Sequence, residues 1–302
     1  MAKRAARAFL LAAVRFSGAA WIARYTIQSH RVTVLAYHDP DPGVFERHIA
    51  LLESLYAIVP LEALLSMLGD NGLRSLPPRA LVVTLDDGWA GNARLLPVVR
   101  RHGIRPAVFV TTAIAGTHRH FWWTHVPDPA ERERAKLLPA DERLRALAAS
   151  GFEQGADYPD RQALSLDEIS EMSAWADVEA HTCSHPILPT CSDDQAEWEI
   201  AGSADDVERM TGMRPRAFAY PNGDRSARDV ALVRTAGYEA AFTVEPGYVG
   251  AASDRYALHR IVISNDAGAT ELIARASGVY GALARAGRRT SGGRSVASPA
   301  DL

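Results

Sequence analysis

Cysteine is scarce in this 302-residue chain, and its N-terminal end has no acidic residue. The two cysteines, Cys183 and Cys191, are too few for a disulfide framework and fit a reducing compartment. A net charge of −3 gives the chain no general attraction to nucleic acid, so we expect no nucleic-acid partner. The 47% of hydrophobic and 23% of charged residues are ordinary for a globular protein with a sizeable core.

The first acidic residue is Asp39, whereas residues 1–31 carry six basic side chains beside two short apolar runs. Arg15 interrupts the apolar residues, so no run reaches the roughly 20 residues of a membrane span. A basic, apolar, acid-free helix is typical of a segment that lies on an anionic membrane surface. The alternatives are a helix that packs on the domain or is disordered, and a secretory signal.

The role of this N-terminal segment decides where the protein is found. We expect a protein that is cytoplasmic or peripheral to the inner membrane, or one that is secreted or periplasmic if residues 1–20 are a signal peptide. Residues 1–31 precede the first predicted strand, so we also expect the rest of the chain to fold without them.

From residue 32 onward, short apolar runs alternate with helical patterns. The apolar runs predict strands at 32–38, 81–86, 106–112, 178–182, 216–220, 239–244 and 257–263. Helices are predicted at 43–56, 61–69, 90–102, 167–176, 193–211, 226–236 and 269–284. Seven β-then-α units in succession indicate an α/β fold with a parallel sheet. The length favours an incomplete or distorted barrel over an open doubly wound sheet.

Residues 113–165 interrupt this alternation. The segment is charged in its middle and opens with an aromatic cluster, Phe121-Trp122-Trp123. We interpret it as a mostly helical insertion after the third predicted strand. Its aromatic residues would either pack beneath it or stack on sugar rings. Residues 286–302 are rich in Gly, Ser and Arg, and we predict a disordered tail.

Polar residues stand at the carboxyl ends of several predicted strands. Asp86 and Asp87 close the second strand, and His181 and His185 follow the fourth. The carboxyl ends of the strands in a parallel barrel meet at one face, where active sites form. Two histidines and a carboxylate are a common ligand set for zinc or a similar divalent ion. The pattern therefore predicts one metal site.

Three motifs in this order, TLDDGW, HTCSHP and FAYPNGD, resemble those of the polysaccharide deacetylase (NodB-homology) family. The stretch from Val34 to Leu65 is also similar to the opening of that domain in bacterial exopolysaccharide deacetylases. The resemblance implies a distorted (β/α)7 barrel, a divalent metal that is usually zinc, and hydrolysis of N-acetyl groups on amino sugars. The chain would then divide into a basic helix (1–31), a catalytic domain (32–285) that includes the insertion, and the tail.

The resemblance also implies roles for individual residues of the three motifs. Asp86 matches the general base, and Asp87 matches the metal ligand beside His181 and His185. Asp86 would then take a proton from the water that attacks the amide carbonyl. The backbone N–H of Asn222 would stabilise the oxyanion.

The third motif departs from the family pattern at Ala219, where many members carry an arginine that orients the base. Arg260 and Arg216 are the alternatives for that role. The family's general acid is a histidine near a late strand, which His259 resembles. His38 is the second choice.

The remaining predicted contacts concern the substrate. Tyr220, Pro221 and His38 are expected to bind an N-acetylated polysaccharide or oligosaccharide. The sequence thus predicts a metal-dependent hydrolase that removes N-acetyl groups from the amino sugars of a polysaccharide or its precursor. One alternative is the same chemistry on a small non-sugar amide. Another is a non-catalytic carbohydrate-binding barrel, against which the intact ligand and base residues argue.

Overall fold

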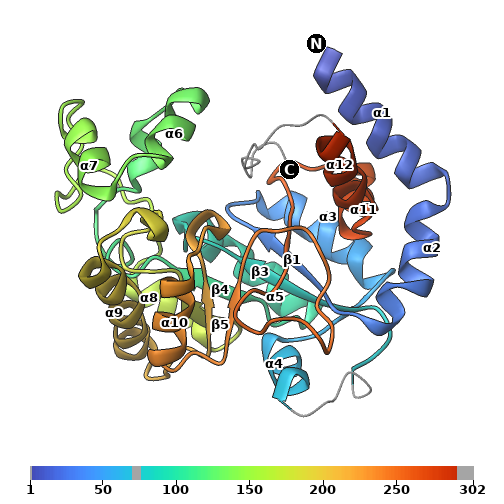
Figure 1. Ribbon diagram of the computed structural model, residues 1–302. Helices are drawn as coiled ribbons and strands as arrows, with labels where there is room; N and C mark the ends of the chain where they lie inside the picture. The colour runs from blue at the N-terminus through green and yellow to red at the C-terminus, as the bar shows by residue number, and fades with distance from the viewer. Residues whose placement is uncertain (1, 70–75, 291–302) are drawn as a thin grey trace. The chain divides into compact units, whose positions relative to one another are not determined.

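The structure is a computed structural model that describes residues 2–69 and 76–290 (Figure 1). The chain forms two compact units, and each is described by itself. Unit 1 comprises Met1–Thr84, Pro97–Pro106 and Val244–Leu302, and unit 2 comprises Leu85–Leu96 and Ala107–Thr243. The first boundary along the chain, between Thr84 and Leu85, therefore falls within one strand and inside the first motif, TLDDGW.

Unit 1 is built on short buried strands. They are β1 (Thr33–Tyr37), β2 (Ala57–Ile58), most of β3 (Ala80–Leu85) and β8 (Ile261–Val262). β1 pairs with β8 and β2 pairs with β3, both in parallel. Every residue of β1 and β3 is buried, which is why both read as continuous apolar runs in the sequence.

The helices of unit 1 include both terminal helices of the described chain. They are α1 (Ala2–Phe16), α2 (Ala19–Thr26), α3 (Pro42–Glu53), α4 (Leu61–Gly69), most of α5 (Leu96–His102), α11 (Ala269–Ala276) and α12 (Val279–Thr290). The helix predicted at 269–284 is two helices, because Gly278 adopts a left-handed conformation with φ of 70° between them. α12 continues to Thr290, past the start predicted for the disordered tail, and residues 291–302 lie outside the described residues.

The N-terminal helices pack on the C-terminal ones. α1 lies against α11 (Figure 1), and α2 contacts α12. Leu11 and Val14 of α1 lie in one hydrophobic cluster with Ile273 of α11 and Tyr280 of α12. Arg7 adds an ion pair to Glu271, with Nη2 2.6 Å from Oε1. This packing buries one face of α1.

The short 3-10 helix η1 (Gln28–His30), which follows α2, is also part of the core of unit 1. Gln28 is completely buried, and its Nε2 donates to Thr33 Oγ1 at 2.6 Å and to the Ala276 carbonyl at 2.8 Å. Residues 1–31 thus pack on unit 1, and the expectation that the rest of the chain folds without them stays a prediction. The basic and apolar composition of residues 1–31 does not reveal that one side of α1 packs on α11. No helix in the described ranges is both long and apolar enough to cross a membrane.

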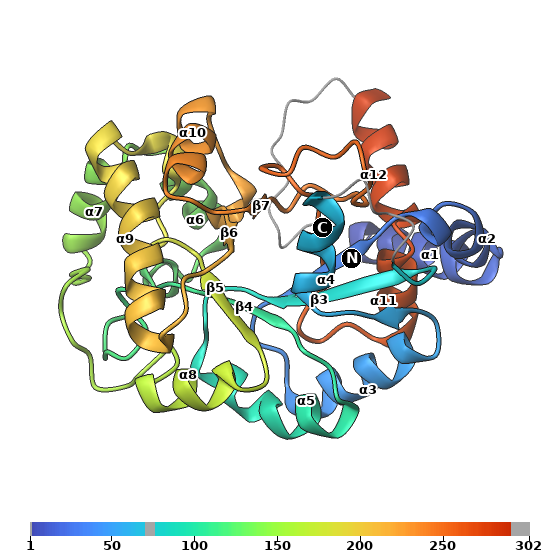
Figure 2. The same ribbon diagram turned by 90° about the horizontal axis from the view of Figure 1, so that it is seen from below.

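Unit 2 contains four parallel strands that are neighbours in chain order (Figure 2). They are β4 (Ala107–Val110), β5 (Asp177–Ala180), β6 (Ala217–Ala219) and β7 (Ala240–Phe242). In register, Val108 lies opposite Val178, and Phe218 lies opposite both Ala180 and Ala241. All carboxyl ends of these strands therefore point the same way, as the sequence predicted.

The helices between these strands begin and end at recognisable signals. They are α8 (Leu166–Ser173), α9 (Asp193–Thr211) and α10 (Ala227–Thr235). A capping box of Ser165 and Glu168 starts α8, and another of Ser226 and Asp229 starts α10.

The seven strands predicted from the sequence are all present. Among the described residues, the one strand that was not predicted is β2, which is two residues long.

The segment 113–165 carries a short 3-10 helix, η4 (Trp122–His125), and two α-helices, α6 (Pro129–Lys136) and α7 (Ala140–Ala148). Trp122 is buried in a hydrophobic cluster with Leu147 and Phe152 of the same segment and with Ile187. Phe121 is also buried, whereas Trp123 is half-buried. Two of the three aromatic residues thus pack beneath the insertion.

The packing of α1 generates a test of its contribution to stability. Leu11 is 6% exposed and faces α11, whereas Phe9 on the same helix is 76% exposed. Leu11→Ala should lower the free energy of unfolding by about 2–3 kcal/mol, because it removes buried methyl groups and leaves a cavity. Phe9→Ala is the control and should change it by less than about 0.5 kcal/mol. Chemical denaturation measures both, and equal effects would contradict this packing.

Candidate metal centre

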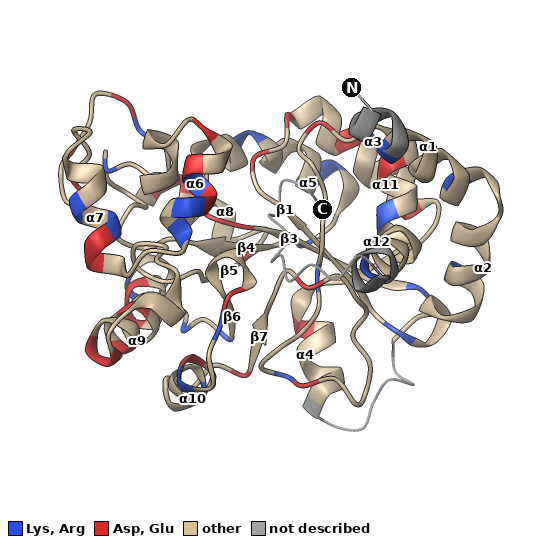
Figure 3. Ribbon diagram, turned by 45° about the horizontal axis from the view of Figure 1, so that its top comes forward, with Lys and Arg blue, Asp and Glu red and all other residues tan. Residues whose placement is uncertain are grey.

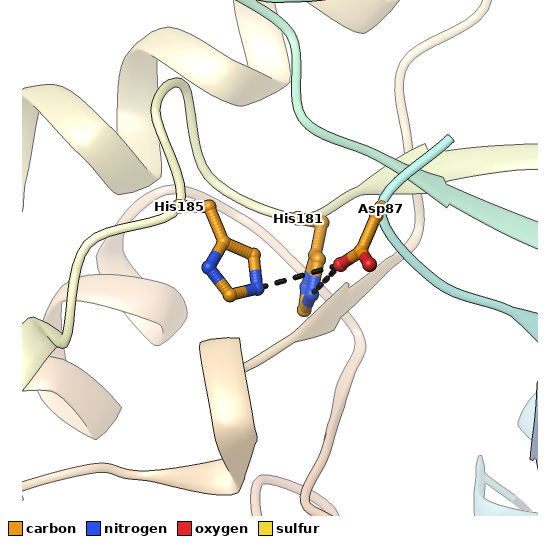
Figure 4. A group of neighbouring side chains, drawn as sticks. All are labelled: Asp87, His181 and His185. Carbon is orange, nitrogen blue, oxygen red and sulfur yellow. Dashed lines mark ion pairs between the residues drawn. The ribbon is translucent and has the colours of Figure 1, made fainter. Parts of the chain in front are cut away.

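Asp87, His181 and His185 form a buried cluster in unit 2 (Figure 4). Asp87 Oδ1 lies 3.4 Å from Nε2 of His181 and 3.4 Å from Nε2 of His185. One potential ligand atom of each residue lies within 4.8 Å of the others. Within the described ranges, no other group of three His, Cys, Asp or Glu residues meets this condition. The three side chains that the sequence brought forward as ligands therefore converge, in a geometry that fits a divalent ion.

Tight turns after two strands bring these side chains together. Asp87 is the second residue after β3 and has φ of 71°, and Thr182 and His185 in the loop after β5 have φ of 67° and 58°. Residues other than glycine rarely adopt this left-handed conformation, which costs on the order of 1 kcal/mol or more at each position. Gly88 extends the first turn, and a Cβ atom there would lie 2.9 Å from Val110 Cγ1. Backbone strain is thus concentrated at the cluster.

Trp89 orients the carboxylate of Asp87. Its indole Nε1–H donates a hydrogen bond of 2.8 Å to Asp87 Oδ2, so that Oδ1 is the oxygen that faces the histidines. The ring of Trp89 is itself held by Phe121, with ring centroids 4.5 Å apart. No role for Trp89 was predicted from the sequence. The only signal was an indole N–H two residues after the ligand.

The imidazole of His181 is oriented by a main-chain carbonyl of the neighbouring strand. His181 Nδ1 lies 2.7 Å from the carbonyl oxygen of Ala219, at the end of β6. A carbonyl can only accept, so Nδ1 carries the proton and Nε2 presents its lone pair to the cluster. Ala219 therefore contributes to the site through its backbone.

His185 is held in its neutral form. Burial and the neighbouring His181 lower the pKa of His185 to about 3. A neutral imidazole is the form that binds a metal ion. The ring of Trp123 lies 4.2 Å from the His185 ring, and Trp122 Nε1 donates to the His185 carbonyl at 3.0 Å. The insertion therefore forms one wall of the site.

A buried carboxylate from α9 anchors the loop between the two histidines. Glu199 accepts a hydrogen bond from the backbone N–H of Ser184, at 2.8 Å, and another from the Ser184 hydroxyl. Glu199 is 1% exposed, and burial raises its pKa to about 7, against the opposing effect of these donors and of Arg143. Neither Ser184 nor Glu199 was identified from the sequence, because their contact joins a loop to a distant helix turn.

Other predicted site residues of unit 2 lie at the same strand ends. Asp86 is buried and directly precedes Asp87. Tyr220 and Pro221 follow β6 and are buried, and Asn222 has a left-handed backbone with φ of 53°. Their catalytic and substrate-binding roles stay predictions.

Arg216 lies at the opposite, amino end of β6. Its guanidinium pairs with Glu239, with Nε 2.6 Å from Oε1 and Nη2 3.1 Å from Oε2. This position does not suit the role of orienting Asp86.

The remaining predicted residues belong to unit 1. His38 follows β1, and His259 precedes β8 and packs against Gly247, where a Cβ atom would lie 2.7 Å from His259 Cγ. Arg260 is completely buried and donates to Thr84 Oγ1 at 3.1 Å. The proposed roles of His38 and His259 as general acid stay predictions.

A family model for polysaccharide deacetylases matches residues 74–241, which include all three candidate ligands and Asp86. The chain belongs to the polysaccharide deacetylase family. It is therefore a hydrolase of the family that cleaves N-acetyl amide bonds in polysaccharides. The resemblance stated from the three motifs is confirmed.

Known proteins are similar to this family member in sequence and in fold. YxkH of Bacillus subtilis (strain 168), whose name describes it as a polysaccharide deacetylase, is 23% identical over 256 residues, which are 81% of this chain and 75% of YxkH. The structure of the Streptococcus pyogenes deacetylase PplD in complex with acetate has a TM-score of 0.60 at 18% identity, over 81% of this chain and 97% of PplD. IcaB from Ammonifex degensii has a TM-score of 0.59 at 19% identity, over 83% and 98% of the two chains. The predicted fold class, a NodB-type (β/α) barrel, is confirmed.

The indole of Trp89 generates a prediction about metal affinity. Trp89→Phe keeps an aromatic ring against Phe121 but removes the N–H that holds Asp87 Oδ2. We expect this deacetylase to bind a divalent metal about 10–100-fold more weakly, the usual cost of losing such an orienting contact. Trp123→Phe is the matched control, since it keeps a ring beside His185 and should stay near wild type. Competition with a metal-sensitive dye measures the affinities, and equal losses would argue against an orienting role.

The raised pKa of Glu199 predicts a pH-dependent stability. The pKa of Glu199 is about 7 in the folded protein and 4.5 in the unfolded chain. The protonated carboxyl therefore stabilises the fold fully below pH 4.5, and this contribution is lost as the pH rises through about 7. Glu199→Gln keeps an acceptor for Ser184 and cannot ionise. Between pH 4.5 and 8, the wild type should therefore lose up to about 3 kcal/mol of unfolding free energy relative to the variant. Glu197 is exposed on the same helix, so the control variant Glu197→Gln should show the same pH dependence of the unfolding free energy as the wild type. If Glu199→Gln also showed that pH dependence, the prediction would be refuted.

Proposed function

We propose that this deacetylase is metal-dependent and removes N-acetyl groups from the amino sugars of an exopolysaccharide or its precursor. The observation that carries the proposal is the convergence of Asp87 Oδ1 with Nε2 of His181 and His185. Two imidazoles and one carboxylate form an incomplete coordination sphere, which leaves positions for water and substrate. The similarity of residues 34–65 to the opening of exopolysaccharide deacetylase domains supports the choice of polymer.

Zn²⁺ is the ion that this donor set suits best. Two neutral imidazole nitrogens and one carboxylate oxygen are borderline donors that fit zinc better than magnesium or calcium, which prefer oxygen ligands alone. The ring orientation of His181 supports this choice. Its Nδ1–H donates a hydrogen bond to a carbonyl, so its Nε2 is left to act as a ligand. When bound, such an ion supplies Lewis-acid chemistry to an amide carbonyl and to water.

The chain's own residues would move the proton and stabilise the charge of the reaction. Asp86, buried beside the ligand Asp87, accepts the proton of the water whose oxygen attacks the amide carbon. The backbone N–H of Asn222 donates to the developing oxyanion. The C–N bond then breaks, His259 or His38 gives a proton to the departing amine, and acetate and a free amino sugar result.

The half-buried rings of Trp89 and Trp123 support a sugar as the substrate. Their ring centroids lie 6.3 Å apart, and the Trp123 ring lies 4.2 Å from that of His185. The two indoles offer aromatic surface to a ring that carries the acetamido group. We accordingly place the amino sugar of the polymer against these indoles, with its acetamido group directed to the ligand cluster.

Matched substitutions of the adjacent aspartates test the two roles. Asp86→Asn should keep the metal and the fold but lower the rate of acetate release from N-acetylglucosamine oligomers by about 10²-fold or more, because the base is lost. Asp87→Asn, its isosteric control one residue away, should lose the metal as well as the activity. Elemental analysis and an acetate assay on the same samples give both readouts.

The reverse pattern, in which Asp86→Asn loses the metal and Asp87→Asn keeps it, would show that the two roles are exchanged. A wild-type protein that binds one metal ion but releases no acetate from any oligomer would instead refute catalysis on this substrate class.

A further inference from the structure

The two N-terminal helices carry an apolar surface that faces away from unit 1. We define this outer face by its exposed large apolar side chains: Phe9, Phe16, Trp21, Ile22, Tyr25 and Ile27. Phe9 and Phe16 lie seven residues apart, on one side of α1, and are 76% and 73% exposed. Trp21 and Tyr25 lie one turn apart on α2, with ring centroids 4.9 Å apart. Both helices therefore contribute exposed aromatic side chains to the outer face.

The outer face is distinct from the surface that holds the helices in place. Leu11, Val14 and Ala20 make the contact with the C-terminal helices, so the apolar residues of the outer face are not needed for it. Among the described residues, six of the twelve exposed large apolar side chains fall within residues 9–27. Such a concentration in so short a segment marks an interaction surface, whereas single exposed apolar residues are ordinary.

All charged residues of α1 and α2 are basic. The ribbon of α1 and α2 carries basic but no acidic residues (Figure 3), and the first acid of the chain is Asp39. The guanidinium of Arg15 lies 5.3 Å from the ring centroid of Phe16, and that of Arg79 lies 4.9 Å from the ring centroid of Tyr25. Cations thus lie among the aromatic rings themselves.

Fewer basic side chains are available at the outer face than the sequence suggested. Arg24 is 6% exposed, and Arg7 is paired with Glu271. Arg7 and Arg24 are therefore engaged in the fold. Apolar side chains should consequently contribute more to any interaction of this face than charge does.

We propose that the outer face binds the surface of an anionic phospholipid membrane, with both helices lying parallel to it. Trp and Tyr side chains favour the membrane–water interface, and Phe and Ile add apolar area that the acyl boundary can bury. Arginines at the edge of the same face complement anionic head groups. This one-signed charge beside aromatic residues favours a lipid surface over a protein partner, and the inference is independent of the metal-site proposal.

Vesicle sedimentation with the full-length protein tests this surface. The wild type should sediment with vesicles of phosphatidylcholine and phosphatidylglycerol, and less with phosphatidylcholine alone. Replacement of Phe9, Phe16, Trp21 and Ile22 by serine should weaken this binding about tenfold or more, because it removes the apolar contribution. The control replaces Leu137 and Trp198, which are 80% and 55% exposed elsewhere, by serine and should bind as the wild type does.

Thermal denaturation shows whether each variant is folded, and raising the salt from 0.1 to 0.5 M should weaken binding only a few-fold. Wild-type protein that stays in the supernatant with anionic vesicles would overturn the proposal, and so would an equal loss in the control variant. A wild-type dimer that the fourfold serine variant converts to a monomer, with no vesicle binding by either, would assign the face to self-association and also overturn it.

Discussion

Burial of the Asp87 carboxylate between two imidazoles is the constraint on which the rest of the site depends. A buried carboxylate is costly unless a cation or hydrogen bonds compensate it, and both neighbouring histidines present Nε2 to the same oxygen. His185 is held neutral by burial, so the protein alone supplies little positive charge there. This arrangement is what a divalent ion would satisfy, and it accounts for the backbone strain stored in the turns after β3 and β5.

Each ligand is oriented by a contact from a different part of unit 2. Trp89 fixes the Asp87 carboxylate, the Ala219 carbonyl fixes the His181 ring, and Glu199 anchors the loop that carries His185. A metal centre functions only when its ligands are held in place, and these contacts are as specific as the ligands themselves. Because Trp89 packs on the aromatic residues of the insertion, the segment that interrupts the regular fold also supports the site.

The N-terminal segment shows how one helix can serve the fold and present a surface. Its Leu11 side packs on α11, so the segment is part of unit 1, while Phe9 and Phe16 remain exposed on the other side. Composition alone described the segment as basic and apolar and suggested a separable anchor. A helix places residues three and four positions apart on the same side, so the segment has two apolar sides. Three-dimensional packing decides which side is buried against the fold and which is exposed.

Local pattern was enough to predict seven of the strands, the order of the β-then-α units and three residues whose side chains converge, Asp87, His181 and His185, since apolar runs and motif spacing are properties of neighbouring residues. The family followed from the same motifs. Tertiary structure decided what depends on distant residues. It assigned Arg216 to Glu239 at the amino end of β6, gave the backbone of Ala219 the part of an orienting group, and brought Glu199 to Ser184 from fifteen residues away. Those contacts are set by how helices and strands pack, which no short stretch of sequence specifies.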